Sequence, residues 1–145
     1  MINIICVGKI KEKYLTEMIS DYQKRINKYH KLNIIELKDN DDIGKETKEI
    51  LKYISNKDYN IALSINGSKY NSTNFASHID ELFIKTSTIN FIIGGSNGLE
   101  TSVTKMCNEE ISFSDFTFPH GLFRAILLEQ IYRSFKINNN EKYHK

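Results

Sequence analysis

This sequence of 145 residues has only two cysteines, a small net charge and no long apolar run. The two cysteines, Cys6 and Cys107, are too few and too far apart to indicate a disulfide scaffold or a metal cluster, so we expect no metal. No apolar run approaches the roughly 20 residues of a membrane span. The run Ile2–Val7 is also too short for a secretory signal and lacks the basic leader of one. These absences favour a cytoplasmic protein that does not enter a membrane.

Basic and acidic residues nearly balance, so the net charge is only +2. This value does not by itself indicate nucleic-acid binding, which is usually argued from a clearly basic domain or patch. If the chain binds RNA, local clusters must attract the phosphates, although solvated surface lysines are the alternative for most of these residues. The candidates are Lys9, Lys11, Lys13, Arg133, Lys136, Lys142 and Lys145.

What the sequence does have is the composition of an ordinary globular protein. Hydrophobic residues make up 40% and charged residues 26%, which excludes a disordered chain, a collagen and a coiled coil. A chain of this length buries about two-thirds of its unfolded surface, so it needs no disulfide or metal to fold. We therefore expect one domain over residues 1–145. Cys6 lies in an apolar run, where a buried inert thiol is more frequent than a reactive one.

Strand and helix patterns alternate five times along the chain. Apolar runs predict strands at Ile2–Val7, Leu32–Leu37, Tyr59–Ile65, Ile89–Ile93 and Ile111–Phe113. Helical spacing predicts a helix to about His30, one carrying Ile43–Ile54, one capped by Thr73, a short one to about Cys107 and a long final helix. Asn66-Gly67 is expected to end the third strand. Strands that are apolar throughout and separated by helices predict an α/β fold, with a mostly parallel sheet covered by helices on both faces.

The fourth predicted strand leads into the glycine-rich turn Gly94–Gly98. This turn is not a P-loop, because no Lys-Ser/Thr follows the last glycine, and it lacks the spacing and position of the dinucleotide fingerprint. Paired glycines let a ligand approach the backbone closely, and the carboxyl ends of strands are where open α/β sheets bind ligands. A tight structural turn and a cofactor site remain equally open interpretations.

The final helix carries more apolar surface than one side of a sheet needs. A broad apolar arc faces a polar stripe of Glu129, Arg133 and Lys136, and two more apolar side chains widen the arc. From this excess we expect the helix to contact a second subunit, with a centrally buried helix in a monomer as the alternative. The apolar residues are Phe123, Ile126, Leu127, Leu128, Ile131, Tyr132 and Phe135.

Two further features of this region suggest recognition chemistry. Arg124 falls within the apolar arc, so its guanidinium must either escape to solvent past the helix end or pair with an anion such as a phosphate or a developing negative charge. The preceding Phe118-Pro119-His120 suits a helix start. The tail Asn138–Lys145 ends in Tyr143-His144-Lys145, groups that can hold an unpaired base and its phosphate, although bare chemistry favours a frayed terminus.

Taken in order, these segments resemble the RlmH-type enzymes of the SPOUT class, and the resemblance spans the whole chain. Its motifs are densest from Phe91 onward. They are Val7-Gly8-Lys9, the run Phe91–Leu99, Phe113-Ser114, Thr117-Phe118-Pro119-His120, Arg124, the run Glu129–Arg133 and Tyr143-His144-Lys145.

The resemblance implies a methyltransferase that uses S-adenosylmethionine to methylate N3 of a pseudouridine in 23S rRNA of the ribosome. It also implies a homodimer and a carboxyl-terminal trefoil knot, an exception to the usual absence of knots. The residues matching the family's S-adenosylmethionine site are Leu63, Gly94, Phe113, Ser114, Asp115, Phe116, Thr117 and Phe118. The varied side chains of the last six suit a cofactor held mainly by backbone groups.

For this reaction the protein must place N3 in line with an activated methyl group and deal with the N3 proton. His144 is our candidate base, Arg124 or Arg133 stabilises the anionic uracil, and Tyr143 stacks on the base. Two alternatives from other classes remain at this stage. One is a non-catalytic RNA-binding α/β module, and the other is a flavodoxin-like enzyme acting on a small molecule.

Overall fold

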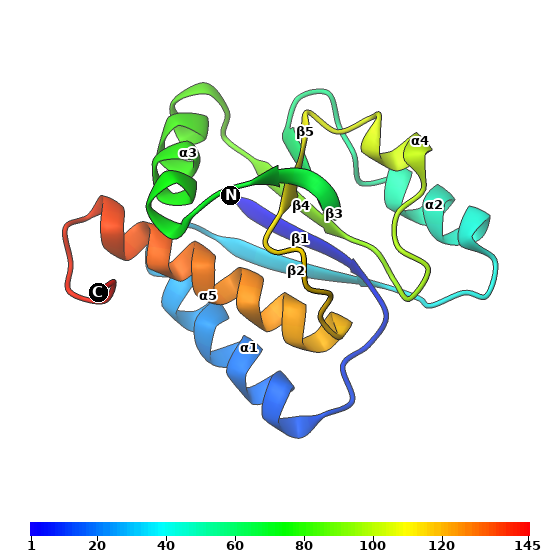
Figure 1. The fold of residues 1–145 in the computed structure, drawn as a ribbon, viewed down its shortest axis with the longest axis horizontal. Helices are drawn as coiled ribbons and strands as arrows, with labels where there is room; N and C mark the ends of the chain where they lie inside the picture. The colour runs from blue at the N-terminus through cyan, green and yellow to red at the C-terminus, as the bar shows by residue number, and fades with distance from the viewer.

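A computed structural model describes all 145 residues and contains one five-stranded sheet with five helices (Figure 1). The strands are β1 (Ile2–Val7), β2 (Leu32–Leu37), β3 (Tyr59–Lys69), β4 (Ile89–Ile93) and β5 (Glu109–Ser112). The helices are α1 (Lys13–Ile26), α2 (Ile43–Leu51), α3 (Ser72–Lys85), α4 (Thr101–Thr104) and α5 (His120–Asn138). All neighbouring strands pair in parallel, in the order β2-β1-β4-β3-β5.

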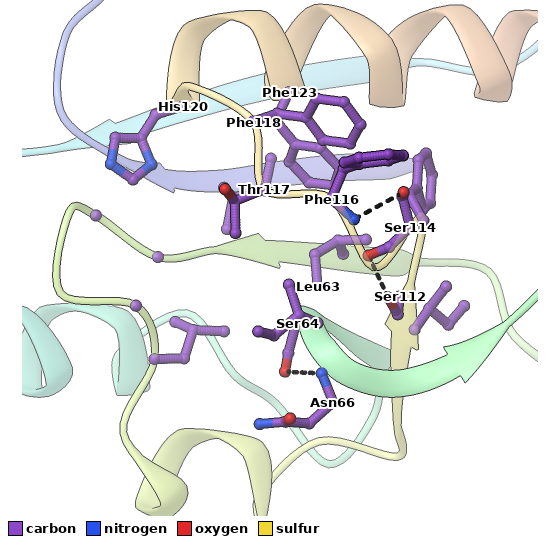
Figure 2. A pocket seen from close by; sticks show the side chains of 18 of the residues that line it. Leu63, Ser64, Asn66, Ser112, Ser114, Phe116, Thr117, Phe118, His120 and Phe123 are labelled. Atoms are coloured by element: carbon purple, nitrogen blue, oxygen red, sulfur yellow. Dashed lines mark hydrogen bonds between the residues drawn. The ribbon is translucent and has the colours of Figure 1, made fainter.

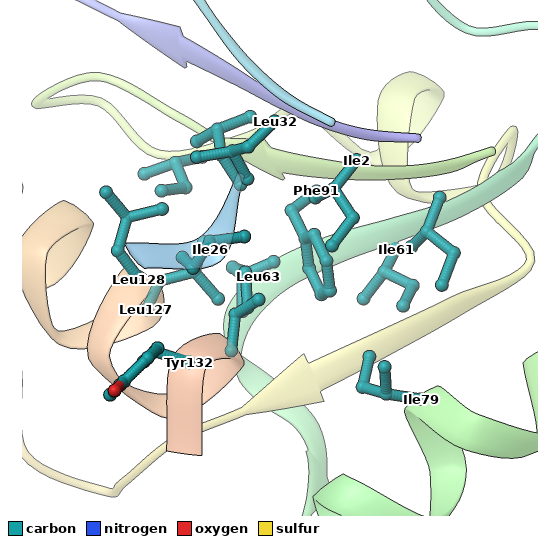
Figure 3. Packing of buried hydrophobic residues seen from close by; sticks show 14 of the residues in the cluster. Ile2, Ile26, Leu32, Ile61, Leu63, Ile79, Phe91, Leu127, Leu128 and Tyr132 are labelled. Carbon is teal, nitrogen blue, oxygen red and sulfur yellow. The ribbon is translucent and has the colours of Figure 1, made fainter. Parts of the chain in front are cut away.

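Helices cover both faces of the sheet, which confirms the predicted α/β arrangement. The helices α1, α3 and α5 pack on one face, around a core in which Phe91 is fully buried (Figure 3). The smaller core on the other face lies under α2 and α4 and includes Ile50 and Val103. Cys6 is fully buried, and this burial raises the pKa of its thiol to about 11, as expected of an inert cysteine. No helix is both long and apolar enough to cross a membrane.

The strands are not apolar throughout, because an asparagine from each of four strands forms a row across the sheet. Asn33 donates to Asn3 (3.1 Å), Asn3 donates to Asn90 (2.9 Å), and Asn90 donates to Asn60 (2.9 Å). The register aligns these four residues at the amino-terminal side of the sheet. The side-chain amides of this row, of which Asn60 and Asn90 are buried, therefore satisfy one another, which removes the cost of leaving them without a hydrogen-bond partner.

Two predicted boundaries were wrong. Thr73 does not cap α3, since the side chain of Asn71 accepts the hydrogen bond from the amide of Asn74 and Thr73 lies inside the first turn. Asn66-Gly67 does not end β3, which continues to Lys69 after its register against β5 shifts. A Cβ on Gly67 would lie 2.6 Å from the backbone of β5, so glycine here permits close strand approach instead of a turn.

The remaining boundaries differ by a few residues. The first helix ends at Ile26 instead of near His30, the second at Leu51, and the last strand is Glu109–Ser112. The helix α5 lies between α1 and α3, so most of its apolar arc is buried inside the chain. The excess of apolar residues that suggested a second subunit is thus largely explained by two intramolecular neighbours.

Candidate functional site

A pocket of about 520 Å³ lies where β4 and β5 end and β3 bends between them (Figure 2). Four parts of the chain meet around it, and they contribute serine, threonine and asparagine groups beside apolar side chains. The lining residues include Leu63–Asn66 from β3, Ile93–Leu99 after β4, Ile111–Ser114 with Phe116–Phe118 after β5, and His120 with Phe123 from α5. This is the sheet edge at which parallel α/β folds bind ligands.

The glycine turn after β4 forms one wall of this pocket. Gly98 has a φ of +73° and donates its amide hydrogen to the carbonyl of Gly95 (3.0 Å). A Cβ on Gly94 would lie 2.5 Å from the carbonyl oxygen of Gly98, so this glycine is required by the turn itself. The two interpretations of the sequence are therefore compatible, because a tight structural turn also borders a ligand-sized cavity.

The segment Phe113–Phe118 forms the opposite wall. Its bend is fixed by Ser114, whose carbonyl accepts from the Ser112 hydroxyl (3.1 Å) and whose hydroxyl accepts from the Phe116 amide (3.0 Å). Of the eight residues matched to a cofactor site, seven line the pocket. The exception is the side chain of Asp115, which is exposed and pairs with Lys69 at the rim.

A second group of predicted residues gathers near the end of α5. Arg133 lies over the ring of Tyr143 (4.9 Å), binds Glu129 and donates to Nδ1 of His144 (2.9 Å). The Tyr143 hydroxyl in turn contacts Glu129 and Tyr22, each at 3.1 Å. We call Glu129, Arg133, Tyr143 and His144 together the tail cluster.

The tail is consequently not a frayed terminus, as bare chemistry suggested. Tyr143 packs edge-on against Tyr132 at 4.9 Å and is only partly exposed. Burial, the hydrogen bond with Tyr22 and the charge of Glu129 raise the pKa of the Tyr143 phenol, so it stays neutral. The last residues of the chain are therefore held on α1 and α5 by specific contacts.

Arg124 belongs neither to the pocket lining nor to the tail cluster. Its side chain is 3% exposed and does not escape to solvent. It donates to the carboxylate of Glu36 (2.6 Å) at the end of β2 and to the carbonyl of Gly8 (3.1 Å) after β1. Its Nε has no partner within the chain. The guanidinium is thus directed at an anion, and within the chain that anion is a carboxylate.

The structure brings the predicted residues together in two places that lie far apart. Arg133 follows His120 by thirteen residues on α5, which corresponds to roughly 20 Å along the helix at 1.5 Å per residue. His120 borders the pocket, whereas Arg133 belongs to the tail cluster. Within one chain the tail cluster therefore does not reach the pocket.

The sequence analysis missed His120 as a site residue. It is exposed, and it is the single ionisable residue among those that line the pocket. Its sequence position gave one indication, because it follows the proposed cofactor segment Phe113–Phe118 after only Pro119. The sequence analysis placed it at the helix start and within a motif of the family resemblance, but gave it no role in the site.

The chain is similar to known proteins along nearly its whole length. A family model described as "Predicted SPOUT methyltransferase" matches residues 1–144. The chain is 51% identical over 153 residues to ribosomal RNA large subunit methyltransferase H from Fusobacterium nucleatum, covering 99% of each chain. It is 44% identical over 154 residues to the protein of the same name from Caldicellulosiruptor saccharolyticus, covering 100% of each.

Two solved structures share the fold at low sequence identity. A probable methylase family protein from Haemophilus influenzae aligns with a TM-score of 0.58 and 12% identity, over 99% of this chain and 70% of that one. The tRNA (m1G37) methyltransferase from Aquifex aeolicus aligns with a TM-score of 0.52 and 17% identity, over 91% of this chain and 69% of the other.

Proposed function

Because this chain belongs to the SPOUT methyltransferase family, we propose that it uses S-adenosylmethionine to methylate N3 of a pseudouridine in 23S rRNA of the large ribosomal subunit. The observation that carries this proposal is full-length similarity to two enzymes named as large-subunit rRNA methyltransferases. The same similarity argues against a non-catalytic RNA-binding module and against a flavodoxin-like enzyme.

The pocket suits S-adenosylmethionine in size and chemistry. Its volume of about 520 Å³ lies within the roughly 300–1,000 Å³ of small-molecule sites, and its walls are mixed apolar and polar. The carboxyl ends of β4 and β5 supply backbone groups from Gly94–Leu99 and Ser112–Phe118, while Leu63 lies between them. We assign these segments to the cofactor. When bound, it supplies a methyl group already activated on a sulfonium.

The residues of the chain then have to position the base and stabilise charge. A neutral thioether leaves, so no metal is needed for the leaving group. Arg133 and Tyr143 of the tail cluster provide a cation and an aromatic face, which are the groups that hold a splayed-out RNA base. A guanidinium near the uracil also stabilises the negative charge that develops as N3 loses its proton. Arg124 links the start of α5, which carries the pocket residues His120 and Phe123, to the ends of β1 and β2.

A homodimer resolves the separation between the pocket and the tail cluster, because a second copy can bring its tail to the pocket of the first. Exposed apolar side chains in the first turns of α1 and α5 support such contact, including Tyr14 (71% exposed) and Leu122 (38%). The first turns of α1 and α5 touch, since a Cβ on Gly121 would lie 2.9 Å from Leu15. Light scattering of the purified protein tests this, and a mass of 16.9 kDa at micromolar concentration would contradict it.

Three further properties are part of this proposal. Residues 1–145 act as one domain, the loops after β4 and β5 belong to a trefoil knot, and the enzyme works in the cytoplasm on ribosomes. They are supported by the single continuous sheet and by the family.

The proposal is tested by mass spectrometry of rRNA from cells that lack this gene and from cells in which it is restored. We expect one methylated pseudouridine in large-subunit rRNA to disappear and then return. An unchanged modification pattern would refute the assignment.

A further inference from the structure

Methylation of N3 requires a group that accepts the N3 proton at the place where the methyl group is delivered. This follows from the proposed function, on which the inference below rests. The acceptor must present an unoccupied lone pair within hydrogen-bond reach of the substrate. Ser64, Asn66, Ser114 and Thr117, which line the pocket, are poor acceptors for such a proton because they are not basic near neutral pH.

His144, the candidate from sequence, does not present such a lone pair in the observed arrangement. Its Nδ1 lies 2.9 Å from a terminal nitrogen of Arg133. A guanidinium only donates hydrogen bonds, so Nδ1 must be the acceptor and a neutral imidazole then carries its proton on Nε2. His144 therefore presents an N–H donor outward. That group suits hydrogen bonding to a uracil oxygen but does not take up a proton.

The charges around Arg133 reinforce this arrangement. Glu129 binds the same guanidinium through Nε and a second terminal nitrogen, so Arg133 is held in one orientation. The aromatic face of Tyr143 lies against it at 4.9 Å. Freeing Nδ1 of His144 would require the Arg133 contact to break.

His120 differs from His144 on each of these points. It lines the pocket itself, on the wall opposite the segment Leu63–Asn66 (Figure 2). It is exposed, and none of the hydrogen bonds or ion pairs within the chain uses its ring. No carboxylate, cation or other imidazole lines the pocket beside it. It is the first residue of α5, directly after Pro119 at the helix cap, so the ring extends from a helix end at the pocket.

We propose that His120 is a catalytic residue that accepts the N3 proton of the pseudouridine. The N3–H bond breaks, and its proton passes to the imidazole, which becomes an imidazolium. The electron pair on N3 forms the new bond to the methyl carbon, while the electron pair of the carbon–sulfur bond returns to sulfur. Positive charge thus moves from the sulfonium to the imidazolium, which later releases the proton to water.

The test compares His120→Gln with His144→Gln in single-turnover methylation of ribosomes at saturating S-adenosylmethionine. Glutamine keeps an N–H donor but cannot accept a proton as imidazole does. We expect His120→Gln to lower the rate by about 10²-fold or more. We also expect it to abolish the fall in rate at acid pH, where wild-type imidazole becomes protonated. His144→Gln should lose rate but keep that acid limb.

Two further measurements separate a catalytic role from a structural one. Calorimetry should give His120→Gln an S-adenosylmethionine affinity within about twofold of wild type, and His30→Gln serves as a control with wild-type rate and pH profile. Added imidazole should restore activity to His120→Ala but not to His144→Ala.

Three outcomes would overturn the inference. They are full activity of His120→Gln, a loss of cofactor affinity that accounts for its defect, or imidazole rescue of His144→Ala instead. Absence of methylation by the wild-type protein would instead refute the proposed function, so the two failures are distinguishable.

Discussion

At the scale of single residues, Arg124 shows how one buried charge joins distant parts of the chain. Its guanidinium lies on α5 but contacts Glu36 after a separation of 88 positions and the carbonyl of Gly8 after 116. Helical periodicity placed Arg124 on an apolar face and therefore predicted that it needs an anion. Periodicity cannot identify a partner so far away in sequence, because that depends on which strand ends adjoin the first turn of α5.

Replacing Glu36 by glutamine should destabilise the protein by about 2 kcal/mol, because a buried guanidinium then loses its carboxylate. The expected loss is below that of a fully buried pair, since the side chain of Glu36 is 38% exposed. Urea unfolding measures the change. Glu17→Gln is the matched control, because the exposed pair of Glu17 with Lys13 contributes little. Equal stability of both variants would show that the Arg124 pair is not structural.

His30 gives the folded state a dependence on pH. Its ring stacks on Phe83 (4.0 Å between centroids) and Phe135. Burial, followed by the nearby amino-terminal charge of Met1, lowers the pKa of this imidazole. Below neutral pH the unfolded chain therefore binds a proton more readily than the folded one. The contribution of neutral His30 to stability is present above the pKa that this residue has in the unfolded chain. It is lost as the pH falls through the lower pKa of the residue in the folded state.

We accordingly expect the melting temperature of the wild-type protein to fall more steeply than that of His30→Gln between roughly pH 7 and pH 5. The slope is the relevant quantity, because the variant also loses ring stacking and will be less stable at every pH. Identical slopes for the two proteins would contradict the assignment of this effect to His30.

At the scale of elements, the prediction succeeded where the pattern depends on local burial. Runs such as Ile89–Ile93 are buried throughout, and this property specified a central parallel strand. It failed where two capping residues lie close together and where two strands meet. Asn71 caps α3 because the helix begins at Ser72, so Thr73 lies inside the first turn, and β3 continues past Gly67 because glycine lets it approach β5 closely. The contact with β5 cannot be derived from one segment alone.

The pocket walls offer a direct test of the cofactor assignment. Gly94→Val is unsuitable, since a Cβ there collides with the turn itself. Thr117→Trp instead adds bulk to an exposed residue that lines the pocket, and we expect it to weaken S-adenosylmethionine binding at least tenfold, or about 1.4 kcal/mol. The control is Thr101→Trp, at the exposed start of α4 and outside the pocket lining. Calorimetry showing equal affinities would exclude the assigned site.

The tail is an element whose order the sequence did not predict, because its contacts come from Tyr22, Tyr132 and Glu129 on two helices. Deleting Tyr143–Lys145 should leave S-adenosylmethionine affinity intact, since the pocket lies elsewhere, yet lower methyl transfer by about 10²-fold, because the uracil base is no longer held in position.

Loss of packing is a separate consequence of that deletion, so His144→Ala provides a second variant that leaves Tyr143 in place. His144 is exposed, so the circular dichroism spectrum of this variant should show an unchanged fold. If both variants methylate ribosomes at the wild-type rate, the tail has no part in the reaction.

At the scale of the whole molecule, parallel strands place the loops after β4 and β5 at one edge of the sheet, where the pocket forms. The sequence pattern indicated this edge, and the family resemblance named seven of the residues that line the pocket. The sequence did not predict that the tail cluster lies far from the pocket, because the length and direction of α5 separate groups that belong to one proposed reaction. A net charge of +2 likewise leaves RNA contact to local groups.

The central claim is that this protein methylates a pseudouridine of large-subunit rRNA. The most direct measurement incubates the purified protein and S-adenosylmethionine with ribosomes from cells lacking the gene, and then analyses the rRNA nucleosides by mass spectrometry. We predict one added methyl group per ribosome, on N3 of a pseudouridine in the large-subunit rRNA. Methyl transfer to a different base, to tRNA, or to no RNA at all would contradict the claim.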